Sequence, residues 1–131
     1  MRTNNTNTKE YLIYPELSYQ ITGILFRIHN SLGRFCKERV YADALAKSLT
    51  EAGISFVREP LIRPTIQGDN LGDYRPDFVI GDSVIIELKA RPIVTKEDYA
   101  QLLQYLRFTN KRLGLLVNFR NKFLKPKRIA N

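Results

Sequence analysis

The sequence is poor in the residues that build disulfide frameworks, zinc clusters and histidine-dependent active sites. Its 131 residues include one cysteine, one histidine, one methionine and no tryptophan. A single cysteine, Cys36, cannot form an internal disulfide or a multi-cysteine metal cluster, so it is expected to be a small packing residue. The single histidine, His29, has no recognisable serine or cysteine partner, which argues against Ser-His-Asp and Cys-His chemistry. We expect His29 to make a local hydrogen bond instead.

Long apolar segments are also missing. No segment reaches the roughly 18 consecutive apolar residues of a membrane-spanning helix, and the first residues lack the apolar stretch of a signal peptide. We therefore expect a cytoplasmic protein without a membrane partner. Residues 1–12 are polar and aperiodic, which indicates a flexible lead-in. Residues 13–131 are expected to form a single domain with one core and a basic C-terminal segment.

Acidic residues are absent from Tyr99 to the C-terminus. The whole chain carries 21 lysines and arginines against 13 aspartates and glutamates, a net charge of +8. Eight basic residues lie in the acid-free part, namely Arg107, Lys111, Arg112, Arg120, Lys122, Lys125, Lys127 and Arg128. Such a segment would attract a phosphate backbone without sequence preference, although a solvated, solubilising tail is the alternative. We expect the first five of these residues to bind a nucleic-acid substrate.

Hydrophobic periodicity predicts elements in the order α-α-β-β-β-α-β. Helices are expected over 17–32, 37–52 and 96–109, with glycine ending the first two. Strands are expected over 61–66, 77–80, 84–89 and 113–119. Pro64 favours an edge position for the first of these strands, and 68–73 is expected to be a turn. The pattern predicts an α/β domain in which helices flank one mixed sheet.

The second and third predicted strands form a hairpin around the loop 81–83. With this loop, residue 80 pairs with residue 84, and each step outward along both strands gives the next pair. Asp77 therefore lies directly opposite Glu87. Because side chains alternate between the faces of a strand, Lys89 lies on the same face as both acids. Two carboxylates and an ammonium group are therefore expected to converge at one end of this hairpin.

Facing carboxylates repel unless a cation or a shared proton lies between them. A hard divalent ion removes this repulsion, and Mg²⁺ is commonly held by one or two carboxylates together with water and substrate phosphate. Lys89 could then orient or deprotonate a water, or neutralise charge on a phosphoryl group. The structural alternative is an ion pair between Glu87 and Lys89, with Asp77 at a strand end. We favour the metal site, because the strand is otherwise an apolar run in which unpaired charges are costly.

Pro76-Asp77 followed after the hairpin loop by Glu87-Leu88-Lys89 resembles the signature of the PD-(D/E)XK nuclease superfamily. The segment from about residue 17 to 129 is similar to the small GxxExxY proteins of that superfamily. The stretch 38–41, Glu-Arg-Val-Tyr, matches the second half of their motif, whereas Phe35 stands where the motif has glycine. Gln101 and Tyr105 match the Q-x-x-x-Y helix of related nucleases. The resemblance implies a restriction-endonuclease-like core.

The resemblance also implies roles for individual residues. Asp77, Glu87 and the carbonyl of Leu88 would bind Mg²⁺ or Mn²⁺, and Lys89 would serve the attacking water. Glu38 would be an additional acid that contacts the ion or its water, although a carboxylate in the first turn of a helix also suits the helix dipole. Gln101 and Tyr105 would face the substrate together, because residues four apart share one helix face. The structural alternative is that a glutamine near a helix N-terminus and a half-buried tyrosine fit any globular domain.

The sequence thus predicts a metal-dependent nuclease that hydrolyses phosphodiester bonds, with DNA preferred over RNA by resemblance. A nuclease fold that serves as a nucleic-acid-binding or adaptor module, with weak or no catalysis, is the first alternative. A metal-dependent hydrolase that acts on another substrate is the second. A homodimer is left open.

Overall fold

The computed structural model describes residues 14–63, 65–66, 69–70 and 72–131. The described helices are α2 (Pro15–Leu32), α3 (Glu38–Glu51) and α4 (Lys96–Thr109). The described strands are β1 (Phe56–Arg58), β2 (Thr65–Ile66), β3 (Asp69–Asn70), β4 (Phe78–Ile80), β5 (Val84–Lys89), β6 (Leu113–Asn118) and β7 (Lys127–Ala130). The three helices begin and end close to the predicted residues. None of these helices combines the length and the hydropathy that crossing a membrane requires. The predicted lead-in, residues 1–12, lies outside the described residues.

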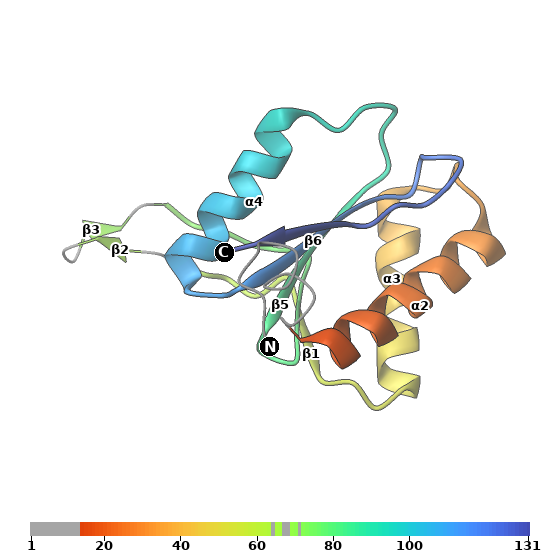
Figure 1. The fold of residues 1–131 in the computed structure, drawn as a ribbon, viewed down its shortest axis with the longest axis horizontal. Coiled ribbons are helices and arrows are strands. Elements are labelled where there is room, and N and C mark those ends of the chain that lie inside the picture. The colour runs from red at the N-terminus through yellow and green to blue at the C-terminus, as the bar shows by residue number, and fades with distance from the viewer. Residues whose placement is uncertain (1–13, 64, 67–68, 71) are drawn as a thin grey trace, which may run out of the picture.

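One mixed sheet forms the centre of the fold (Figure 1). Its strand order is β1-β4-β5-β6-β7, and only the β5–β6 pair is parallel. Helix α4 connects these two parallel strands, as such a crossover requires. Figure 1 shows α2 and α3 on one side of the sheet and α4 on the other. The predicted α/β architecture with helices flanking a mixed sheet is therefore confirmed.

The β4–β5 hairpin has the predicted register. Phe78 pairs with Ile86, and Ile80 pairs with Val84. The turn begins with Gly81 and Asp82, both in the left-handed region at φ 60° and 55°. Glycine and aspartate tolerate this conformation better than most residues, which explains why the chain reverses here. The register places the residue before β4, Asp77, opposite the fourth residue of β5, Glu87.

The two faces of the sheet bury different groups of side chains. On the α2–α3 face, Phe78, Ile86 and Leu88 pack with apolar residues from both helices. On the α4 face, a smaller cluster joins Val79 and Ile85 to residues of α4. This division follows the alternation expected from the sequence. Both faces of the hairpin are buried, which fixes its register, because a slip by one residue would exchange the two sets.

The predicted outer strand over 61–66 is wrong. The edge strand beside β4 is instead β1, whose Phe56 pairs with Ile80. Phe56 packs against the core and its ring lies 5.7 Å from that of Phe78, which gives β1 its apolar contact. Within 61–66, Ile62 forms one isolated bridge, and β2 pairs with β3 outside the main sheet. The predicted turn over 68–73 is only partly described, and its residues 69–70 form β3. Pro64 and Gly68 lie outside the described residues.

The basic C-terminal segment contains a strand that the predicted order lacked. Strand β7 pairs antiparallel with β6, so that Leu113 faces Ala130 and Leu116 faces Lys127. Ala130 packs against the main core and Ile129 against the α4 cluster. The end of this segment is therefore the second edge of the sheet, not a tail in solvent.

Candidate active site

The open end of the hairpin brings Asp77 and Glu87 into direct contact. The backbone N–H of Asp77 donates a hydrogen bond to Oε1 of Glu87 at 3.0 Å. The backbone N–H of Leu88 donates to Oδ2 of Asp77 at 2.6 Å. Each carboxylate is thus held by the backbone of the opposite strand. The hairpin register, rather than chance side-chain packing, sets the distance between the two acids.

The electrostatics of the pair follow from its burial. Removal from water raises the pKa of Glu87 from its ordinary 4.5 to about 7, and the facing charge of Asp77 adds to the rise. Burial also raises the pKa of Asp77, although the Leu88 N–H and the Lys89 ammonium group oppose that rise. The protein's own cations do not fully compensate the two carboxylates. An added cation would therefore be favoured here.

Glu38 and Asp77 line the same cleft. Glu38 is the first residue of α3, and burial followed by the charge of Asp77 raises the pKa of its carboxyl. Lys89 and Arg91 act in the opposite direction. The cleft has a volume of about 510 Å³, and four acids, two arginines and two apolar residues line it: Glu38, Asp43, Glu59, Asp77, Arg39, Arg58, Ala42 and Leu88. The hairpin and the start of α3 thus form one acidic site with a lysine beside it.

Tyr41 fixes α3 in the orientation that presents Glu38. Its ring stacks on Phe119, the residue after β6, with centroids 4.1 Å apart and 6° between the ring planes. Its hydroxyl donates to the carbonyl of Gly33 at 2.6 Å and accepts the N–H of Cys36 at 3.1 Å. The tyrosine that ends the 38–41 stretch therefore holds both the preceding loop and the helix. Cys36 packs against the core, as expected for a small packing residue.

The donor atoms suit a hard divalent cation. The cleft offers carboxylate and backbone carbonyl oxygens, the ligands that Mg²⁺ and Mn²⁺ prefer, and Arg39 and Arg58 line it as well. Throughout the described ranges, no three aspartate, glutamate, histidine or cysteine side chains already lie at metal-ligand spacing. Asp77 and Glu87 would thus need the Leu88 carbonyl and water to complete a coordination shell, which is the usual arrangement for Mg²⁺. The residues present fit such an ion.

A chain of contacts links α4 to Glu87. Nε2 of Gln101 donates to the hydroxyl of Tyr105 at 3.1 Å, so the two residues share one helix face as predicted. The ring of Tyr105 stacks on Tyr74, with centroids 3.4 Å apart. The hydroxyl of Tyr74 donates in turn to Oε2 of Glu87 at 3.5 Å. The motif residues of α4 therefore reach the acid pair through Tyr74.

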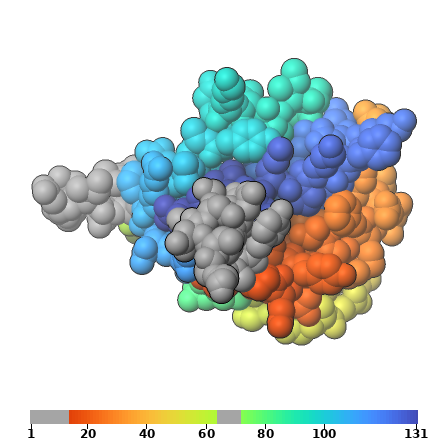
Figure 2. Space-filling view, in the orientation of Figure 1, coloured from red at the N-terminus to blue at the C-terminus, as the bar shows by residue number. Residues whose placement is uncertain are grey.

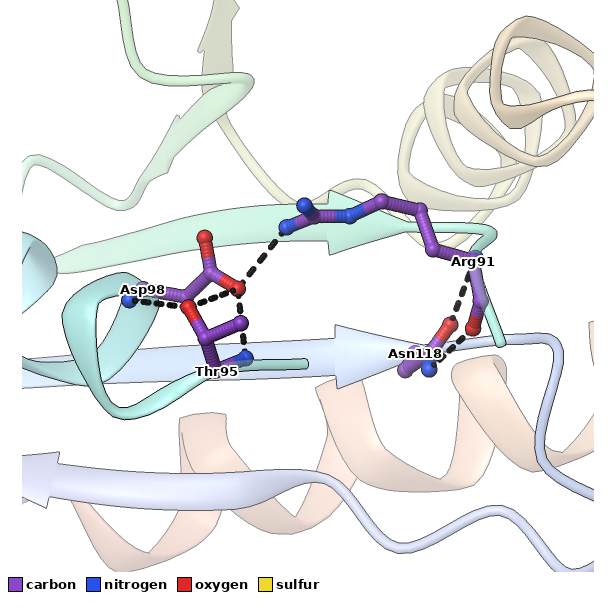
Figure 3. Close-up of polar contacts among 4 residues, drawn as sticks. All are labelled: Arg91, Thr95, Asp98 and Asn118. Carbon is purple, nitrogen blue, oxygen red and sulfur yellow. Dashed lines mark hydrogen bonds and ion pairs between the residues drawn. The ribbon is translucent and has the colours of Figure 1, made fainter. Parts of the chain in front are cut away.

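The connection from β5 to α4 is pinned beside the site (Figure 3). The backbone N–H and carbonyl of Arg91 bond the side-chain amide of Asn118 at 3.2 and 2.7 Å. The Arg91 guanidinium pairs with Asp98 at 2.9 Å, and Asp98 and Thr95 form the capping box of α4. Hydrogen bonds from Thr95 and the Arg91 charge outweigh burial and lower the pKa of Asp98. These contacts fix the backbone that leaves Lys89.

The predicted substrate-binding cations fall into two groups. Arg120 and Lys122 follow β6 at the end where Lys89 pairs with Asn118. The others, Arg107, Lys111 and Arg112, lie where α4 ends and β6 begins, beside the start of β5. Lys111 donates to the carboxylate of Asp82 in the hairpin turn at 2.9 Å. Since β5 separates the two ends by about 3.3 Å per residue, the structure brings only the first group to the site.

Sequence reasoning did not single out Glu59 or Tyr74. Glu59 has φ 52°, donates its N–H to the carbonyl of Asp77 at 3.0 Å and lines the cleft. Tyr74 is buried and bonds Glu87. The only sequence feature that could have indicated a role for Tyr74 is its position three residues before Asp77. The predicted local hydrogen bond of His29 is wrong, because its Nε2 bonds the carbonyl of Asn121, 92 residues away in sequence, at 2.9 Å.

The family of the chain is shown by comparison with known sequences. The model of the PD-(D/E)XK nuclease superfamily matches residues 15–129, from the start of α2 into β7. The chain belongs to this superfamily. A search of curated proteins found no match.

Solved structures share the fold. The crystal structure of SSO0001 is similar with a TM-score of 0.54 and 18% identity, over 95% of this chain and 60% of that one. An alkaline exonuclease from Laribacter hongkongensis, LHK-Exo, is similar with a TM-score of 0.51 and 16% identity, over 87% of this chain and 69% of that one. The complex of LHK-Exo with dAMP gives the same TM-score at 18% identity. The chain spans less than two thirds of the length of SSO0001.

Proposed function

We propose that the protein is a metal-dependent nuclease that hydrolyses phosphodiester bonds, with DNA preferred over RNA. The observation that carries this proposal is the contact of Asp77 with Glu87 at the open end of the hairpin, beside Lys89. Membership of the PD-(D/E)XK nuclease superfamily supports it. A nucleic-acid partner is also consistent with the net charge of +8.

We propose specific roles for the residues in and beside the cleft. Asp77, Glu87 and the Leu88 carbonyl would hold Mg²⁺ or Mn²⁺, with Glu38 as an additional acid. When bound, the ion would stabilise the negative charge that develops on the phosphoryl oxygens. Lys89 would orient the attacking water and accept or share its proton.

Gln101 and Tyr105 would orient a substrate phosphate, since their polar groups meet on one face of α4. We also propose membership of the GxxExxY proteins, supported by the positions of Glu38 and Tyr41 at the start of α3. The dAMP in the LHK-Exo complex supports DNA as the substrate class. The cytoplasmic location, the single domain over 13–131 and a homodimer stay predictions.

A cleavage assay tests the proposed function. Labelled single-stranded, duplex and branched DNA, with matching RNA, would be incubated with the protein in Mg²⁺, in Mn²⁺ and in EDTA. We expect cutting in either metal and none in EDTA, with DNA cut faster than RNA. Nucleic-acid binding that survives EDTA, without cutting in any metal, would instead support the adaptor function. Absence of both binding and cutting would exclude each of these functions.

Replacement of Tyr74 with phenylalanine is expected to weaken metal binding about 10- to 100-fold. The change removes the hydroxyl that contacts Oε2 of Glu87 but keeps the ring that stacks on Tyr105. Glu87 would then be less well oriented, whereas the fold would be unaffected. The measurement is the Mn²⁺ concentration at half-maximal cleavage, together with thermal stabilisation by Mn²⁺.

Tyr105→Phe is the matched control for this variant, because it removes a hydroxyl from the same stack without touching Glu87. Without substrate, its thermal stabilisation by Mn²⁺ should equal that of the wild type, whatever its effect on cleavage. Equal Mn²⁺ dependence of Tyr74→Phe and the wild type would show that Tyr74 does not position Glu87.

A further inference from the structure

A shallow groove lies beyond the carboxyl ends of β5 and β6. It has a volume of about 540 Å³, and we call it the Phe35–Phe123 groove. Its lining combines two phenylalanines with four cations: Arg34, Phe35, Arg120, Lys122, Phe123 and Lys125. Pro92 and Asn121 complete the lining, so the groove contains no acid. In Figure 2 the blue surface of the segment after β6 adjoins the orange surface of the segment around the end of α2. The groove is thus built from segments distant in sequence.

The two phenylalanines are unusually exposed. Phe35 is 75% exposed and Phe123 is 72% exposed. A single exposed apolar residue is ordinary, but two aromatic rings in one concave, cationic surface are not accounted for by solubility. Neither ring contributes to the core clusters of the described residues. Most of each side chain therefore lies in solvent, where a ligand can reach it.

Cations accompany both rings. The guanidinium carbons of Arg34 and Arg120 lie 4.8 and 5.6 Å from the centre of the Phe35 ring. Nζ of Lys122 lies 5.5 Å from the centre of the Phe123 ring. The Nε atoms of both arginines are buried without a hydrogen-bond partner among the described residues. Buried unpaired donors are costly, and an anionic ligand that reorients the guanidinium groups would remove that cost.

The groove is hydrogen-bonded to the end of the strand that carries Lys89. The N–H of Phe119 donates to the carbonyl of Lys89 at 2.9 Å, and Nη2 of Arg120 donates to the carbonyl of Ala90 at 3.2 Å. Arg120 is therefore anchored to the residue that directly follows Lys89. A polymer that lies in the groove would lead to the catalytic end of β5.

We propose that the Phe35–Phe123 groove binds an unpaired nucleic-acid strand, with bases stacked on Phe35 and Phe123 and phosphates near the four cations. Every base has a π-face, so such stacking holds single strands regardless of sequence. A duplex keeps its bases stacked on one another and cannot offer them to the rings. This inference rests on the proposed nuclease function and makes its substrate a single strand, or a substrate with an unpaired segment. Phe35, which stands where the resemblance expects glycine, would provide one of the two stacking surfaces.

Binding in EDTA tests the groove separately from catalysis. Fluorescence anisotropy would measure the Kd of labelled oligothymidylate, oligouridylate and a duplex of the same length. Phe35→Ala and Phe123→Ala are each expected to weaken single-strand binding about 5- to 150-fold. Duplex binding should change little, because it depends on the cations alone. The lower Kd of the two single strands shows whether the groove prefers DNA or RNA.

Tyr19→Ala is the matched control, because Tyr19 is 82% exposed on α2 and lies outside the groove. It should bind single strands as the wild type does. Phe35→Trp keeps a ring for stacking and should restore the affinity that Phe35→Ala loses. Since both phenylalanines are exposed, the thermal unfolding midpoints of these variants should match that of the wild type.

The outcomes separate the groove from the nuclease function. The groove proposal is wrong if both alanine variants bind single strands as tightly as the wild type does, or if they lose as much affinity for duplex as for single strands. This holds even if the wild type cuts nucleic acid. A selective loss of single-strand binding, together with no cleavage by the wild type in Mg²⁺ or Mn²⁺, supports the groove and removes the nuclease function. Selective loss of both binding and cutting of single strands supports both.

Discussion

Replacement of Lys89 with methionine is expected to reduce metal-dependent cleavage about 10²- to 10⁴-fold. Lys89 is half-buried at the end of β5, and its charge acts on Glu38, Asp77 and Glu87. Methionine has a similar length and no charge, so the variant can neither share the proton of a water nor neutralise a phosphoryl oxygen. Single-turnover cleavage rates at saturating metal isolate this chemical role from substrate binding.

The Lys89 test needs variants that separate chemistry from net charge. Lys47→Met removes one positive charge from an exposed position on α3 and should cut as the wild type does. Asp77→Asn should lose as much activity as Lys89→Met, because it removes a proposed metal ligand. Full cleavage by both Lys89→Met and Asp77→Asn would place the active site elsewhere.

The hairpin could be predicted to the residue because two independent constraints agree. The three-residue loop 81–83 fixes the sum of paired residue numbers, and the apolar alternation fixes the faces. Loop length and apolar alternation therefore suffice to predict that Asp77 contacts Glu87. The helix carrying Gln101 and Tyr105 was predictable for the same reason, since both ends have clear signals: the Thr95 cap at one and Asn110 at the other.

The remaining errors come from contacts that local patterns do not encode. Strand β1 has only three residues, too few to show the alternation typical of a strand. The apolar residues Leu61 and Ile62 led to the prediction of a strand further along the chain. The residue after β1, Glu59, has a positive φ, and Pro60 follows it, so β1 ends early. Strand β7 is stabilised by pairing of Ala130 and neighbouring residues with β6. Its basic composition does not show the apolar pattern by which strands are predicted.

The site residues that were missed are also held by long-range contacts. Tyr74 matters because it touches Glu87 across the sheet and Tyr105 on α4. The Phe35–Phe123 groove exists because Arg120 lies beside Phe35, although many residues separate them in sequence. Spacing rules apply within an element or a hairpin. They do not predict which loops meet at the end of a sheet.

Replacement of Glu87 with glutamine is expected to abolish cleavage and yet to stabilise the metal-free protein. The folded pKa of Glu87 is about 7, against an ordinary value of 4.5. Below the ordinary pKa, folded and unfolded chains are both protonated. As the pH rises from there to about 7, the unfolded chain ionises first, so the wild type loses stability, by about 3 kcal/mol in all. Glutamine keeps the shape but has no charge to desolvate.

Urea unfolding in EDTA, at several pH values from weakly acid to weakly alkaline, measures this difference. The two proteins should be similarly stable at the acid end, and the advantage of Glu87→Gln should grow until the pH passes the folded pKa. Mg²⁺ should stabilise the wild type at alkaline pH, because it binds the folded state, and should have little effect on the variant. An advantage that is constant across the pH range would contradict a buried, ionising carboxylate. In our interpretation, the buried charge of Glu87 both destabilises the metal-free protein and attracts the cation. A constant advantage would mean that another property of Glu87 destabilises the wild type.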